Sequence, residues 1–304
     1  MTPDLRGTFL PVTTPFDPVT GDVDVVAFRS NLRHWFEHPL AGILIAGSTG
    51  ESVLLSPREL EALVEASRDV VPEDRLVLVG TNAEATRHVI AESVRAAELG
   101  ADAVLVKPPA YYRGAMSPRA LVDHYKRLAD ASPIPVIVYQ VPLRLSTLEF
   151  PTAVVAELSR HPNIVGIKDS RGNLEQVGEL VEQCVEGFQV LVGAGSILYG
   201  GLEIGAVGGI VAVGLLAPAA AAEVSLAFSK DRKADAGRAQ EVIAPVHTRV
   251  VGGMGVPGVK VALDLLGLHG GLPRPPLMAP PEEQRDEIRK ILASAGLLDR
   301  AAAT

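Results

Sequence analysis

Short apolar segments alternate with longer amphipathic segments along most of the chain, and this alternation restricts the fold more than any other feature of the sequence. A strand that is buried on both faces of a parallel sheet is apolar along nearly its whole length. The segments that fit this description are residues 8–12, 42–46, 76–80, 103–106, 136–139, 164–168, 190–193 and 208–212. They predict eight parallel strands.

The segments between these strands have the spacing of apolar residues that is typical of helices. Ser56-Pro57 has the pattern of an N-cap residue followed by the first helical residue, and Glu59 completes a capping box. Ser117-Pro118 begins a second helix in the same way. The other predicted helices are residues 25–37, 85–99, 152–159, 174–185, 196–202 and 217–229.

Eight strand–helix units in chain order are typical of a (β/α)8 TIM barrel. The alternative α/β fold is a doubly wound open sheet, which usually has a glycine-rich phosphate loop after its first strand. This chain has Thr13-Thr14-Pro15-Phe16 at that place. We therefore expect a TIM barrel in residues 1–230 and a C-terminal α-helical extension, residues 231–304, packed on the barrel. Its predicted helices are residues 233–250, 256–266 and 281–295.

Charge and composition exclude several classes of partner. The 28 basic and 36 acidic residues give a net charge of -8, which argues against nucleic acid or an anionic membrane as the partner. No basic stretch and apolar run begin the chain, and no apolar segment is long enough to span a membrane. The histidines are not clustered at metal-ligand spacing. We therefore expect a cytoplasmic protein without a metal ion.

The sixth predicted strand ends at Lys168. In a TIM barrel the reactive groups lie at the carboxyl ends of the strands and in the loops that follow. Burial there lowers the pKa of a lysine from about 10.4 toward ~7–8 and frees its lone pair to attack a carbonyl. Lys107, after the fourth strand, has a similar position, and either lysine could instead reach solvent. The residues alone leave both as candidates for a Schiff base.

Two other strand ends carry side chains that suit such chemistry. Tyr139 closes the fifth predicted strand, where a phenol can relay protons. Arg144 follows it and could bind a carboxylate through a bidentate hydrogen bond. After the second strand, Gly47 and the hydroxyls of Ser48 and Thr49 can face a carboxylate or a proton chain. A core-edge tyrosine, a surface arginine and a flexible turn explain these features equally well when each is taken alone.

Three motifs together resemble those of the dihydrodipicolinate synthase / N-acetylneuraminate lyase family of Schiff-base lyases. They are GSTGE at 47–51, YQVPLR at 139–144 and GIKDS at 166–170, and the resemblance extends over residues 7–298. It implies a class I lyase or aldolase that binds a pyruvate-type 2-oxo acid as an imine and takes an aldehyde as its second substrate. It also implies a homotetramer or homodimer that needs no metal and no organic cofactor.

The resemblance gives roles to the candidate residues. Lys168 matches the lysine that forms the imine, which favours it over Lys107. Tyr139 matches the tyrosine that moves protons at the imine. Ser48 and Thr49 match the hydroxyl pair that binds the substrate carboxylate and links to that tyrosine, and we expect the proton path to pass through Thr49.

Two further residues match positions known in the synthases of the family. Tyr112 matches a tyrosine that reaches across a dimer interface into the neighbouring site. Arg144 matches the arginine that binds the carboxylate of the aldehyde substrate. Gly47 lies beside the hydroxyl pair, and we expect it to belong to the same carboxylate site.

Within the family, the stretches at 111–117 and 161–170 most resemble 4-hydroxy-2-oxoglutarate aldolase, whereas Arg144 and Thr49 match the synthases. The sequence therefore favours aldolase-like cleavage or condensation, with 4-hydroxy-tetrahydrodipicolinate synthase, which joins pyruvate to aspartate semialdehyde, as the alternative. A non-catalytic relative that only binds a 2-oxo acid is the alternative of another class. The set of Lys168, Tyr139 and Thr49 argues against it, because a pure binder needs no proton relay.

Overall fold

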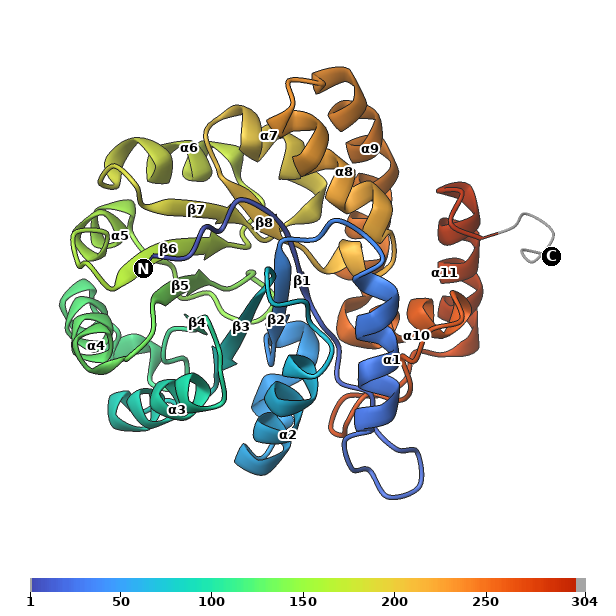
Figure 1. Cartoon of the computed structure of the whole chain (residues 1–304), viewed down its shortest axis with the longest axis horizontal. Coiled ribbons are helices and arrows are strands. Elements are labelled where there is room, and N and C mark those ends of the chain that lie inside the picture. Colours follow the sequence, from blue (N-terminus) through green and yellow to red (C-terminus); the bar gives the residue numbers. More distant parts are fainter. Residues whose placement is uncertain (1, 299–304) are drawn as a thin grey trace.

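Eight parallel strands pair in chain order and close on themselves, because the first strand pairs with both the second and the eighth. The computed structural model describes residues 2–298, and Figure 1 shows the helices arranged around these strands. The strands are β1 (Gly7–Pro11), β2 (Gly42–Ile45), β3 (Leu76–Thr81), β4 (Ala103–Val106), β5 (Val136–Gln140), β6 (Ile164–Asp169), β7 (Gln189–Val192) and β8 (Gly208–Ile210). The predicted TIM barrel is confirmed, and each predicted strand lies within two residues of an observed one.

Side chains alternate between the barrel interior and the layer beneath the helices, as the pleat of a strand requires. A small apolar cluster that includes Phe9, Ile137 and Tyr139 fills the interior, and a much larger cluster lies between the strands and the helices. Ile167 packs in the outer cluster. The next residue along β6, Lys168, therefore faces inward.

A helix follows each strand, at the positions that the apolar spacing predicted. The predicted capping box is present: the backbone N–H of Ser56 donates to Glu59 Oε2 at 2.8 Å, and Ser56 Oγ accepts from the Glu59 backbone N–H at 3.3 Å. The helices are α1 (Val25–Trp35), α2 (Pro57–Arg68), α3 (Thr86–Glu98), α4 (Pro118–Ala131), α5 (Thr152–Leu158), α6 (Leu174–Gln183), α7 (Leu198–Glu203) and α8 (Pro218–Ser229).

The C-terminal helices lie against the side of the barrel where α1 and α8 are found (Figure 1). They are α9 (Lys233–Val246), α10 (Gly253–Leu265) and α11 (Glu282–Ser294). The continuous helix expected over 233–250 instead ends at Val246 and passes into a π-helix, His247–Gly252. The division of the chain at residue 230 stays a prediction, and residues 299–304 of the expected extension lie outside the described residues. Within residues 2–298, no helix combines the length and apolar character needed to cross a membrane.

Candidate active site

Lys168 lies inside the barrel near the carboxyl end of β6. It pairs in register with Tyr139 of β5, and its Nζ lies 4.6 Å from the centre of the Tyr139 ring. The residue is only 5% exposed. Burial lowers the pKa of the Lys168 amine, and the neighbouring Tyr139 opposes this shift only in part. The neutral, nucleophilic form is therefore favoured relative to a lysine in water.

Lys107 has a different environment. Its Nζ lies 2.6 Å from Oε1 of Glu84, in an ion pair whose carboxylate side chain is 46% exposed. Glu84 Oε2 also accepts the backbone N–H groups of Ala110 and Tyr111, which fixes this carboxylate in place. The structure thus gives Lys107 a structural partner, and only Lys168 of the two lysines lies beside Tyr139.

The loop after β2 brings a hydroxyl to the same tyrosine. The side-chain oxygens of Ser48 and Tyr139 are 3.4 Å apart, at the outer limit of a hydrogen bond. The neighbouring Thr49 lies on the same short 3-10 helix, Ser48–Gly50. The structure therefore places Ser48 at Tyr139, while the proton path through Thr49 stays a prediction.

Two residues with left-handed backbone conformation flank this loop. Ala46 has φ 50° and Glu51 has φ 58°, which is unusual for residues with a Cβ atom and is typical of functional sites. Gly80 on β3 permits the turn, because a Cβ atom there would lie 2.1 Å from the Ala46 carbonyl oxygen. The loop is also held by Thr14, whose Oγ1 donates to the Gly50 carbonyl at 2.7 Å.

Arg144 lies in the loop after β5 and is held by the C-terminal extension. Its Nη1 donates to the carbonyls of Val251 at 2.5 Å and Gly252 at 2.9 Å, both in the π-helix. Tyr112 is 72% exposed, and its ring packs edge-on against that of Tyr111 at 5.1 Å between ring centres. The expected substrate role of Arg144 and the partner role of Tyr112 stay predictions.

Two buried titratable groups near this site were not singled out from the sequence. Asp169 follows Lys168, and its Oδ2 is buried without a hydrogen-bond partner among the described residues. Burial raises the pKa of Asp169 to about 6, against a smaller opposing effect of its hydrogen bond from the Arg171 backbone. The second group is His247. Its Nδ1 accepts the backbone N–H of Gly195, a residue that follows β7, at 3.2 Å. Burial, and then the charge of Arg144, lowers the pKa of His247 to about 4.

These two groups give folding stability opposite dependences on pH. The native protein holds the Asp169 proton more tightly than the unfolded chain does, so this group lowers stability as pH rises from about 4 to about 6. Neutral His247 has the reverse effect, raising stability as pH rises from about 4 to about 6.5. Between pH 4 and 6, we therefore expect the unfolding free energy of Asp169→Asn to gain about 2–3 kcal/mol relative to the wild type. Urea unfolding at several pH values measures this, and parallel pH curves would contradict the assignment.

The matched variant for this measurement is His247→Asn, because an asparagine oxygen can still accept from Gly195. We expect its stability relative to the wild type to fall as pH rises through the same range. The two variants should therefore diverge in opposite directions.

Within the part of the chain that the structure describes, no three His, Cys, Asp or Glu side chains are grouped so that they could hold a metal ion. The polar groups that meet around Tyr139 are the buried amine of Lys168, the phenol of Tyr139 itself and the part-buried hydroxyl of Ser48. Such a set suits nucleophilic attack on a carbonyl with proton transfer beside it.

A family model, similar sequences and solved structures all indicate the same family for this chain. The model of the dihydrodipicolinate synthetase family matches residues 4–295. A probable mitochondrial 4-hydroxy-2-oxoglutarate aldolase of Emericella nidulans is 32% identical, covering 98% of this chain and 97% of that protein. A 4-hydroxy-tetrahydrodipicolinate synthase of Syntrophus aciditrophicus is also 32% identical, covering 96% of this chain and 99% of that one.

A solved structure extends the likeness to a known ligand complex. The dihydrodipicolinate synthase of Acinetobacter baumannii, crystallised with pyruvate, is 28% identical, with a TM-score of 0.91 over 97% of this chain and 100% of that one. The fold, the family match and the two relatives agree over nearly the whole length. This chain therefore belongs to the dihydrodipicolinate synthetase family and is a carbon–carbon lyase.

Proposed function

We propose that this lyase works by forming a Schiff base between Lys168 and the C2 carbonyl of a pyruvate-type 2-oxo acid. The observation that carries the proposal is the buried Lys168 amine, whose Nζ lies 4.6 Å from the centre of the Tyr139 ring in the interior of the barrel. Among the described residues no ion pair joins Lys168 to a carboxylate, and a buried lysine of this kind is costly to the fold. Such costly buried groups are typical of functional sites, which supports the proposal.

The proposed chemistry begins when the neutral Lys168 amine attacks the C2 carbonyl carbon and forms a carbinolamine. Transfer of a proton to the carbinolamine hydroxyl releases water and leaves a protonated imine, which serves as an electron sink. In condensation, loss of a C3 proton gives an enamine that attacks the aldehyde carbon. In cleavage, the C3–C4 bond breaks to the same enamine, and the aldehyde leaves.

Tyr139 is the proposed proton carrier in these steps, with Ser48 as its hydroxyl partner at 3.4 Å. Thr49 and Gly47 complete the proposed site for the substrate carboxylate. A tyrosine acting in this way contributes roughly 10²–10⁴-fold to the rate.

We propose 4-hydroxy-2-oxoglutarate as the substrate, cleaved to pyruvate and glyoxylate or formed from them. Condensation of pyruvate with aspartate semialdehyde is the second candidate, because the two relatives compared above are equally similar to this chain and Arg144 stands where a carboxylate clamp is expected. A coupled assay that offers pyruvate with each aldehyde and compares kcat/KM decides between them. Pyruvate trapping without turnover of either aldehyde would instead favour a non-catalytic 2-oxo acid binder.

Arg144→Ala is expected to raise KM for a carboxylated aldehyde by roughly tenfold or more, because a charged hydrogen bond contributes about 1.5–3 kcal/mol. Imine formation with pyruvate should change little. The measurement is steady-state kinetics with glyoxylate and, as the control, with an aldehyde that has no carboxylate. Arg144→Lys keeps the charge but loses the two-pronged donor, so an intermediate KM is expected. An unchanged KM for glyoxylate would rule out the clamp.

We further propose that the chain assembles as a homotetramer or homodimer in which Tyr112 contacts a neighbouring copy. The support is the pair of exposed tyrosine rings at the barrel mouth, because large exposed aromatic side chains often mark interfaces. Light scattering of the wild type and of Tyr112→Ala tests this, with a loss of assembly expected in the variant.

A further inference from the structure

A fully buried ion pair joins the loop after β2 to the C-terminal extension. Lys260 of α10 and Glu51 at the end of the loop lie with Nζ and Oε1 2.6 Å apart, and both side chains have 0% exposure. The contact is an ion pair rather than a well-aligned hydrogen bond. Two residues far apart in the sequence thus meet at the edge of the candidate active site.

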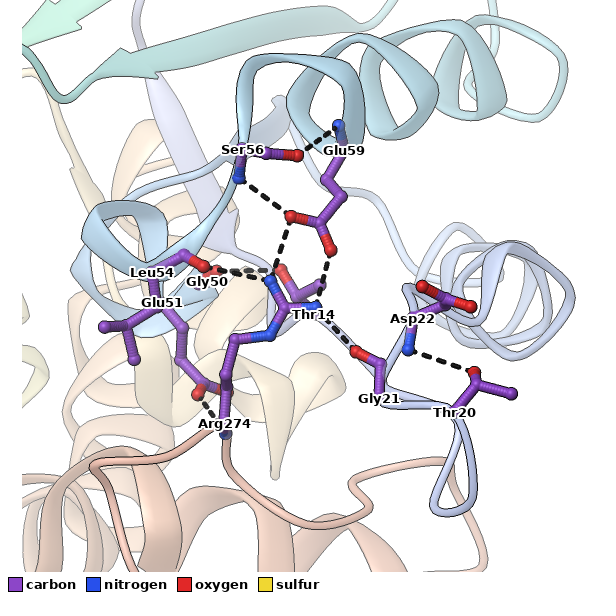
Figure 2. A network of polar contacts seen from close by, with 10 residues as sticks. All are labelled: Thr14, Thr20, Gly21, Asp22, Gly50, Glu51, Leu54, Ser56, Glu59 and Arg274. Carbon is purple, nitrogen blue, oxygen red and sulfur yellow. Dashed lines mark hydrogen bonds and ion pairs between the residues drawn. The ribbon is translucent and has the colours of Figure 1, made fainter.

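The surroundings hold both charges in fixed positions. Lys260 Nζ also donates to the Leu272 carbonyl at 2.9 Å and lies 4.4 Å from the centre of the Phe16 ring. Glu51 Oε2 accepts the backbone N–H of Arg274 at 2.7 Å. Figure 2 shows the Arg274 backbone at Glu51 and its guanidinium at Glu59, so the segment after α10 is bound both to the loop after β2 and to the first turn of α2.

A buried ion pair is seldom the most stabilising solution, because removing two charges from water costs about as much as their attraction returns. The backbone conformation of Glu51 gives a reason for this ion pair. Glu51 has φ 58°, a conformation that a glutamate seldom adopts unless its surroundings impose it. The ion pair with Lys260 and the bond from Arg274 are the contacts that hold this side chain.

The held residue is directly coupled to the hydroxyl at Tyr139. The Glu51 backbone N–H donates to the Ser48 carbonyl at 3.2 Å and closes the 3-10 turn. The same turn presents Ser48 Oγ to Tyr139. A change in the position of Glu51 therefore changes the position of Ser48 and of the N–H groups beside it.

We propose that Glu51 and Lys260 are positioning residues, through which the C-terminal extension shapes the carboxylate half of the substrate site. The inference rests on the proposed Schiff-base function, because it assigns the loop to the carboxylate of the 2-oxo acid. A pair with only a structural role would affect folding and leave the preference for carboxylated ketones unchanged.

The test compares two ketones that react with the same lysine. Pyruvate carries a carboxylate, whereas hydroxyacetone has a CH₂OH group in its place, and borohydride reduces either imine to a stable adduct on Lys168. The ratio of the two trapping rates reports the carboxylate site alone. Changes in the reactivity of Lys168 itself affect both rates and cancel in the ratio.

The main variant is Glu51→Gln combined with Lys260→Met, which leaves no unpaired buried charge and keeps an acceptor for the Arg274 N–H. We expect its pyruvate-to-hydroxyacetone trapping ratio to fall ~10-fold or more, since small displacements in an active site have effects of this size. Glu59→Gln is the matched control. It weakens another ion pair to the same segment, retains the capping box and leaves the 47–51 loop in place.

An unchanged ratio in the folded double variant, judged by circular dichroism and thermal unfolding, would overturn the inference. An equal fall in Glu59→Gln would overturn it as well, because the effect would then belong to the whole extension. If the double variant does not fold, the same ratio is measured on Glu51→Gln alone, with the same two outcomes. A wild-type protein that forms no pyruvate adduct would overturn the Schiff-base proposal and this inference with it.

Discussion

Replacing Lys168 with methionine is expected to abolish turnover, with a loss of ~10⁴-fold or more, because among residues 2–298 no other buried amine faces the Tyr139 ring. Methionine keeps the length of the lysine stem and its packing in the barrel interior. Since the lysine amine is buried and its charge disfavoured, the variant should fold at least as stably as the wild type at neutral pH. Borohydride reduction with pyruvate, followed by peptide mass spectrometry, should give an adduct on the wild type at Lys168 and none on the variant.

Lys107→Met is the matched control for this experiment. Lys107 is the other lysine at a strand end, and its Nζ forms an ion pair with Glu84 Oε1 at 2.6 Å. We expect this variant to keep the pyruvate adduct and most of the turnover. An adduct on Lys107 in the wild type, or full activity in Lys168→Met, would refute the proposed nucleophile.

Tyr139→Phe has the second largest expected effect, a fall in kcat of roughly 10²–10³-fold. The phenylalanine ring keeps the packing of this aromatic ring against the Lys168 amine. What is lost is the hydroxyl that lies 3.4 Å from Ser48 Oγ and that carries protons in the proposed mechanism. Turnover should therefore fall far more than the amount of pyruvate trapped at equilibrium, and single-turnover kinetics with borohydride trapping separates the two.

Tyr125→Phe controls for the removal of a buried phenol. The Tyr125 hydroxyl donates to the Val106 carbonyl at 2.8 Å in the outer layer of the barrel, and the residue is fully buried. Its loss should cost about 1–3 kcal/mol of stability and leave kcat nearly unchanged. Equal effects of the two substitutions on kcat would show that Tyr139 acts only through stability.

The strands and the order of the barrel could be predicted from the sequence because burial on both faces leaves a local pattern. Residues 103–106, for example, are apolar throughout and form β4 with the predicted bounds. The capping box at Ser56 and Glu59 was equally local, since the two residues that form it are three positions apart. Where the chain departs from local rules, as in the π-helix after Val246, the prediction of a regular helix was wrong.

The candidate site was predictable to the extent that a TIM barrel places strand ends together. Lys168 and Tyr139 lie near the carboxyl ends of neighbouring strands, as a barrel of eight strands in chain order requires. Their pairing in register also depends on an irregularity between Val136 and Ile137, which the sequence did not indicate. The choice between Lys168 and Lys107 did not follow from position. It needed the family resemblance, and the structure adds that Lys107 has a carboxylate partner, Glu84, whereas within residues 2–298 no ion pair is found for Lys168.

The sequence by itself thus determined the kind of fold and the set of polar side chains at the barrel mouth. Only the tertiary structure decided which of them touch. Several of these contacts join segments that are distant along the chain. They are the ion pair of Glu51 with Lys260, the hydrogen bonds from Arg144 to the π-helix, and the hydrogen bond from Gly195 to the buried His247. Such contacts leave no periodic pattern in the sequence, because their energies depend on the distance and the loss of water that arise only when the barrel closes and the C-terminal helices pack against it.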